Sequence, residues 1–192
     1  MHRSRIRQWP LLTCLLLGVL FQANSVLAQP ASVESPEFVT QVKAAYLYRF
    51  GNYIEWPATS FDSSKSPIRI GVVGASQLSK VLKLLVVGRT VNGRSMEVLD
   101  LRPDDDVAGL HILFIGSLSE ERLKQVLLGV SGRPILTVTD SEQSFALGSM
   151  INFVMVDGKL RFDVAPTSAG PAGISISARL MTAARKVVTS SS

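Results

Sequence analysis

The chain has 192 residues and a formal net charge of +5, with one cysteine, Cys14, and two histidines. Cys14 and three of the 20 basic residues precede residue 29, which leaves 20 − 3 = 17 basic and 15 acidic residues. Without its first 28 residues the chain would have no thiol, which excludes thiol catalysis, thiol redox sensing and cysteine metal sites. It also shows no basic run of the kind that binds nucleic acid.

The first 28 residues are typical of a secretory signal. Arg3, Arg5 and Arg7 form its positive region, an apolar run spans 11–21, and small residues at 26–28 form a cleavage site. The apolar run is about half of the ~20 residues that a transmembrane helix needs. We therefore expect export and cleavage after Ala28, with a retained N-terminal anchor as the alternative.

Cleavage at that site would leave 192 − 28 = 164 residues, a length that suits one domain. We expect a flexible segment at 29–37, one domain at 38–188 and a disordered tail at 189–192. The sequence shows no internal repeat and no second domain.

An aromatic-rich segment opens the predicted domain. Its apolar residues recur at spacings of three and four, which predicts one face of a helix. They are Val39, Val42, Tyr46, Phe50, Tyr53 and Ile54. Pro57 disfavours the α conformation at Trp56, so we expect the helix to begin at Phe38 and to end just before Pro57.

Strands and helices then alternate. Short apolar runs predict strands at 68–73, 96–101, 112–115 and 135–139. Gly74 is a predicted turn into a helix that holds the apolar residues of 78–86, and Gly88 is its expected end. Ser119 is the predicted cap of another helix that reaches at least Leu127.

Two further predicted strands, 151–156 and 159–164, flank Asp157-Gly158, which is a strong signal for a β-hairpin. A last helix is expected over 176–188, because its apolar residues share one face. This order predicts an α/β fold: a single-domain sandwich with a mostly parallel sheet, an antiparallel hairpin at its edge and helices on both faces.

No motif for catalysis or for cofactor binding stands out. Gly71-Val72-Val73-Gly74 lacks the third glycine of a dinucleotide fingerprint and is interpreted as a tight turn. His111 has no histidine partner for a metal site, and the consecutive acids of 104–106 lack the spacing of a calcium loop. We expect no enzymatic activity, no cofactor and no metal, and a structural role for His111.

Seven residues are candidates for binding a partner: Arg49, Glu55, Trp56, Pro57, Ser175, Ser177 and Arg179. Trp56 has the large apolar area and the N–H group of an interface anchor, and burial in the core is the competing interpretation. Arg49 could pair with a partner's carboxylate or could mark the solvent side of the first helix. Arg179 could bind an anion with the two serines, or one serine could cap the last helix while Arg179 lies on the surface.

Several segments, taken together, resemble the YfiR family. They are Val42–Pro57, Gly88–Arg94, Leu113–Ile115, Arg133–Asp140 continuing into Met150–Val154, and Ile174–Leu180 with the terminal helix. They occur in the family's order with similar spacing, and they cover nearly the whole chain after the predicted signal.

The resemblance implies a periplasmic α/β domain that is often dimeric and has no catalytic chemistry. In the family's best-understood arrangement, such a protein binds and represses an inner-membrane diguanylate cyclase until an outer-membrane lipoprotein sequesters the repressor. Lower cyclic-di-GMP and less biofilm are the implied outputs. A periplasmic small-molecule sensor or carrier without a cyclase partner is the alternative.

The chain departs from the family pattern at two positions. Many members carry cysteines that form disulfides, and a cysteine often stands where this chain has His111. Redox control through cysteine therefore cannot operate in the processed chain. The position of Arg49 is often asparagine in the family, so Arg49 could alter the choice of partner.

Overall fold

The computed structural model of the protein describes residues 34–189, so the predicted signal, most of the expected N-terminal segment and the last three serines lie outside it. The longer elements are α1 (Pro36–Phe50), β2 (Ile68–Val73), α2 (Ser76–Val86), β4 (Arg94–Leu101), β5 (Ile112–Ile115), α3 (Glu120–Val130), β6 (Leu136–Thr139), β7 (Ile151–Val156) and β8 (Lys159–Val164). The shorter elements are β1 (Ile54–Glu55), η1 (Ala58–Ser60), β3 (Thr90–Val91), α4 (Glu142–Ala146), η2 (Pro166–Ser168), β9 (Ser175–Ile176), α5 (Ala178–Ala183) and β10 (Lys186–Val187).

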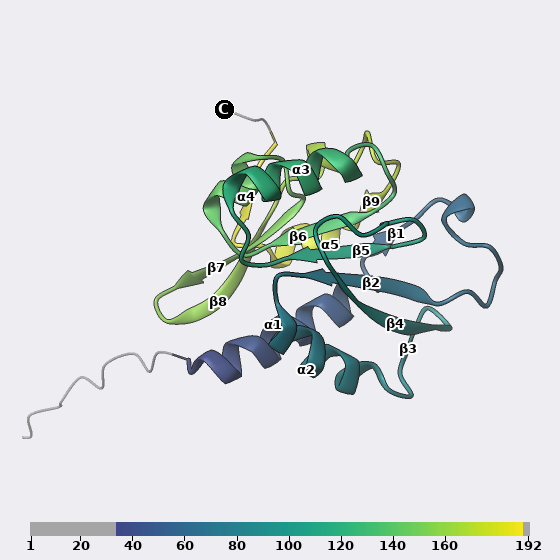
Figure 1. The fold of residues 1–192 in the computed structure, drawn as a ribbon, viewed down its shortest axis with the longest axis horizontal. Coiled ribbons are helices and arrows are strands. Elements are labelled where there is room, and N and C mark those ends of the chain that lie inside the picture. Colours follow the sequence, from purple (N-terminus) through teal and green to yellow (C-terminus); the bar gives the residue numbers. More distant parts are fainter. Residues whose placement is uncertain (1–33, 190–192) are drawn as a thin grey trace, which may run out of the picture. The chain divides into compact units, whose positions relative to one another are not determined.

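One sheet with the strand order β10-β8-β7-β6-β5-β2-β4-β3 organises the described residues. Its pairs are parallel except for the hairpins β7–β8 and β3–β4. α1 and α2 cover one face of this sheet, and α3 and α4 cover the other (Figure 1). The predicted α/β sandwich is therefore confirmed, with β10 as one added strand outside the hairpin β7–β8.

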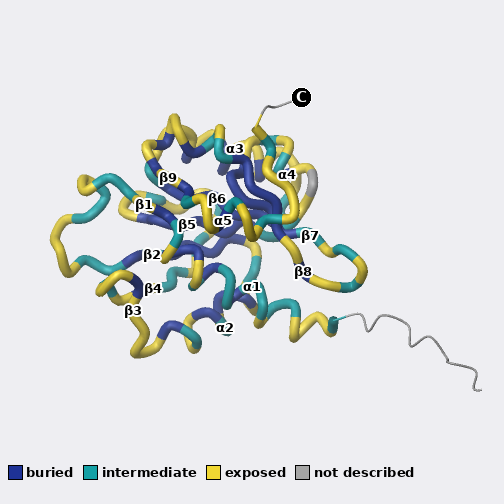
Figure 2. The backbone as a smooth tube through the Cα atoms, turned by 180° about the vertical axis from the view of Figure 1, so that it is seen from behind, coloured by how far each residue is buried: buried dark blue, intermediate teal, exposed yellow. Residues whose placement is uncertain are grey.

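The core lies on both faces of the sheet, and the central strands are buried along their length (Figure 2). A larger apolar cluster joins the sheet to α1 and α2, and a smaller one joins it to α3. Within the larger cluster, the Phe50 ring lies 5.9 Å from the rings of Tyr46 and Phe153 and 5.5 Å from that of Phe162. The aromatic stripe of the first helix therefore serves the core, as its periodicity predicts.

The prediction that the first helix continues to Pro57 is wrong, because α1 ends at Phe50 and Gly51 caps it. The helix also begins earlier, at Pro36, where the Ser35 hydroxyl accepts a hydrogen bond from the Phe38 amide at 3.2 Å. Ile54 continues the apolar spacing, but it is buried within a strand rather than a helix. Apolar periodicity alone cannot separate these two ways of burying a side chain.

The prediction of a single helix over 176–188 is also wrong. α5 covers only Ala178–Ala183, and the chain then becomes extended and pairs as β10 in parallel with β8. Arg185 holds the segment between α5 and β10 against β8. Its Nε donates a hydrogen bond to Asp163 Oδ1 at 2.8 Å, and its Nη2 donates one to the second carboxylate oxygen. Asp163 is buried, so its charge requires such a partner.

Candidate interaction surface

A short antiparallel pair, β1 with β9, joins the two halves of the predicted binding site. Ile54 lies opposite Ile176, and Glu55 lies opposite Ser175. Strand side chains alternate between faces, and both isoleucines are buried, so Glu55 and Ser175 are left exposed. Residues far apart in the sequence therefore form one surface here.

Trp56 follows β1 and is half-buried. Its indole Nε1 donates a hydrogen bond to the carbonyl of His111 at 3.1 Å, and its ring meets the His111 ring edge-on at 5.7 Å. The polar group of the indole is thus satisfied within the protein, as a buried tryptophan requires. Trp56 therefore lies at the border of core and surface, and the half-buried Pro57 leads from it into η1.

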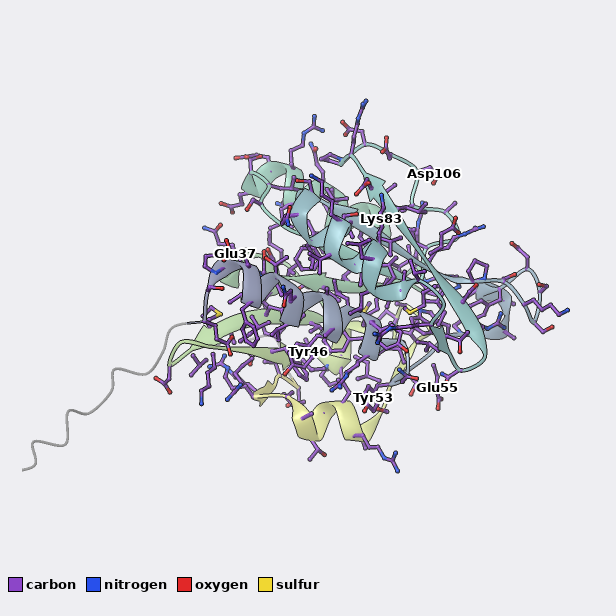
Figure 3. All side chains as sticks on the ribbon, turned by 90° about the horizontal axis from the view of Figure 1, so that it is seen from below. Glu37, Tyr46, Tyr53, Glu55, Lys83 and Asp106 are labelled. Atoms are coloured by element: carbon purple, nitrogen blue, oxygen red, sulfur yellow. The ribbon has the colours of Figure 1, made fainter. Side chains whose placement is uncertain are left out.

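The start of α5 adds the remaining predicted residues. The Ser177 amide donates to the Tyr53 carbonyl at 2.9 Å, and the Ser177 hydroxyl accepts from the Leu180 amide at 3.3 Å. Ser177 is therefore the N-cap of a six-residue helix. Arg179 is exposed, and its side chain has no ion pair within residues 34–189. Figure 3 shows Tyr53 and Glu55 between the end of α1 and α5.

Arg49 occupies a different setting at the end of α1. It is exposed and lines a groove of about 310 Å³ along the helix, together with Gln41, Val42, Ala45 and Tyr46. The structure thus joins six of the seven predicted residues through the β1–β9 pair, with Arg49 beside the groove. We call these six residues the β1–β9 surface: Glu55, Trp56, Pro57, Ser175, Ser177 and Arg179.

Three side chains next to Trp56, those of His111, Phe61 and Arg94, contact the loop that follows it. We call them the His111 column. The His111 ring is buried, its Nδ1 accepts the Arg69 amide at 3.1 Å, and its Nε2 lies 3.1 Å from the Ser60 carbonyl. Because Nδ1 accepts a hydrogen bond, the ring proton is on Nε2, which donates a hydrogen bond to the Ser60 carbonyl. Phe61 stacks on His111 at 4.3 Å, and the Arg94 guanidinium lies 3.8 Å from the centre of the Phe61 ring.

This environment favours neutral histidine. Burial lowers the pKa of His111 below its ordinary value of 6.5, and the guanidinium groups of Arg69 and Arg94 lower it further. The hydrogen bond to Ser60 and the carboxylate of Asp62 oppose this decrease in pKa. A protonated ring would also direct an N–H group at the Arg69 amide, where no acceptor is available.

Mild acid should therefore destabilise the protein. In the unfolded state His111 binds a proton near pH 6.5, whereas in the folded state it binds one only at lower pH. The free energy of unfolding should therefore fall as the pH drops below 6.5 and should level off above that value. Urea unfolding from about pH 7.5 to about pH 5.5 measures this slope. A His111→Gln variant should be less stable throughout but should lack this part of the slope. An identical slope in both proteins would show that His111 is not its source.

Between residues 34 and 189, no three His, Cys, Asp or Glu side chains lie together as a metal site would need. None of the helices in that range is both long enough and apolar enough to cross a membrane.

Comparison with known families supports the resemblance to the YfiR family. A family model described as YfiR/HmsC-like matches residues 40–185, which is most of the chain. The match includes every residue of the β1–β9 surface and the His111 column beneath it. The chain belongs to the YfiR/HmsC-like family of periplasmic regulatory proteins.

Proposed function

We propose that the protein is an exported repressor that binds the periplasmic part of an inner-membrane diguanylate cyclase and so lowers cyclic-di-GMP and biofilm formation. Family membership supports the regulatory role. The pairing of Glu55 with Ser175 supports the location of the binding site, because it gathers a half-buried tryptophan with exposed charged residues. A buried aromatic anchor with a polar rim is a common arrangement at protein interfaces.

Repression requires that the protein bind one state of the cyclase more tightly than the other. Moving an equilibrium from 1:99 to 99:1 takes a ratio of affinities of about 10⁴. In our proposal the Trp56 edge supplies apolar contact, while Glu55, Arg179 and Arg49 match the partner's charges. Removal of the repressor by an outer-membrane lipoprotein and association into a homodimer are further parts of the proposal.

Charge reversal at Arg179 should relieve repression. Arg179 is exposed and has no ion pair among residues 34–189, so Arg179→Glu should change the free energy of unfolding by less than about 0.5 kcal/mol. Cyclic-di-GMP in cells that carry the variant should rise towards the level of cells without the protein. Lys124→Glu, a charge reversal at an exposed lysine of α3, is the matched control and should repress normally. Full repression by both variants would show that Arg179 does not contribute to the interface with the cyclase.

The groove beside α1 supports a second candidate, a sensor of a small aromatic or anionic metabolite. The groove is mainly apolar, and Arg49 stands in its wall as a cation. A ligand at 100 times its dissociation constant should stabilise the protein by about 2.7 kcal/mol. Arg49→Gln should abolish that stabilisation. A panel of such metabolites without any thermal shift would count against the sensor.

A further inference from the structure

The outer side of α2 and the C-cap residue that follows it carry the most exposed large apolar side chains of the described chain. Leu84 is 78% exposed and Val87 is 75% exposed, well above the next value, 66% for Leu128. The opposite side of α2 is fixed in the core by Leu78 and Leu82. The packing of the helix thus turns an apolar pair towards solvent, and Figure 2 shows exposed stretches of α2 on the side away from the sheet.

Basic residues surround this pair. We define the α2 ridge as Lys80, Lys83, Leu84, Val87 and Arg89. Lys80 and Leu84 are four residues apart on α2 and so share one side of the helix, and Val87 is the C-cap residue that follows the helix. Both lysines and Arg89 are exposed, and the Arg89 guanidinium lies 5.7 Å from the centre of the Tyr48 ring.

Among the ion pairs of the described residues, one involves the ridge. Asp100 on β4 forms an ion pair with Lys83, whose hydrogen bond lowers the pKa of that carboxyl. Lys80 and Arg89 have no ion pair within residues 34–189. The ridge therefore carries a net positive charge, which opposes pairing with the same ridge of a second copy and favours an anionic surface.

We propose that the α2 ridge docks on an anionic phospholipid surface. Protruding apolar side chains can enter the boundary between headgroups and acyl chains, while basic neighbours contact the phosphates. A bilayer accepts such side chains without a matching cavity, which a protein partner would have to provide. Two apolar side chains support only weak, reversible binding. The proposal goes beyond repression, because it needs no cyclase.

Vesicle co-sedimentation tests the proposal with protein purified after export. The chain should bind vesicles of phosphatidylglycerol and phosphatidylethanolamine, and should bind phosphatidylcholine vesicles about tenfold less. Leu84→Gln with Val87→Gln should weaken binding about tenfold, and Lys80→Glu should weaken it about fivefold or more. Leu128→Gln, which changes the exposed leucine of α3 on the other face, should leave binding unchanged.

Circular dichroism should show that all variants are folded, since the changed side chains are exposed. If the unaltered chain ignores anionic vesicles, or if the double variant binds as well as Leu128→Gln, the proposal is overturned. If vesicles are ignored and the double variant loses affinity for the periplasmic part of a cyclase instead, the ridge is a protein-docking surface and the lipid proposal is wrong.

Discussion

Replacing Phe50 by alanine should lower the free energy of unfolding by about 3–5 kcal/mol, as the loss of a buried aromatic ring usually does. Phe50 is 1% exposed at the end of α1. Its ring contacts those of Tyr46, Phe153 and Phe162, so truncation removes apolar contacts with both the helix and the hairpin β7–β8. Urea unfolding of the two proteins measures the difference.

Phe38 provides the matched control on the same helix. It is 48% exposed, and its truncation should cost less than about 0.5 kcal/mol. The contrast tests whether the aromatic cluster forms the core between α1 and the sheet. Similar losses for Phe50→Ala and Phe38→Ala would contradict the burial described for Phe50.

Replacing Gly74 by alanine should destabilise the protein by about 2–4 kcal/mol, through two separate effects. Gly74 follows β2 with a φ of +69°, a conformation that strains residues with a Cβ. A Cβ there would also lie 2.9 Å from the backbone carbonyl oxygen of Ser117, and backbone cannot move aside as a flexible side chain can. The turns after β2 and β5 would have to separate.

Gly88 separates the two effects. Its φ is +67°, but a Cβ there would meet nothing within 4 Å. Gly88→Ala should therefore cost only the conformational part, about 1–2 kcal/mol. Thermal or urea unfolding of both variants gives the excess due to close packing. Equal losses at the two glycines would show that the turns after β2 and β5 are not in close contact.

The sequence predicts much of the fold because several elements carry unambiguous local signals. The mainly apolar run of 68–73 and the continuous apolar run of 112–115 are typical of strands buried on both faces, and both have these bounds in the structure. Asp157-Gly158 likewise predicts the hairpin β7–β8 with the observed strand limits. These residues decide their structure locally.

The ends of the first and last helices could not be predicted in the same way. The apolar spacing of Tyr53 and Ile54 continues that of α1, and only the partner strand β9 makes Ile54 part of β1. Lys186 and Val187 become β10 because β8 offers an edge and Asp163 holds Arg185. A two-residue strand that pairs with a distant segment leaves no periodic pattern in the sequence.

The same limit applies to the candidate site. An aromatic residue before proline identifies Trp56 as a possible anchor, and a capping serine identifies the start of α5. Their proximity depends on the β1–β9 register, which the sequence does not encode locally. The sequence predicts a structural role for His111, but it does not predict that Phe61 stacks on His111 or that Arg94 lies over Phe61, since stacking between distant segments has no sequence signature.

We propose that the β1–β9 surface binds the periplasmic part of a diguanylate cyclase. The most direct measurement is the affinity of the purified protein for that isolated cyclase segment, with Glu55→Lys and Arg179→Glu compared with Lys124→Glu. We predict specific binding that weakens about tenfold in the first two variants and is unchanged in the third. Absence of binding by the unaltered protein, or equal affinities for all three variants, would contradict the claim.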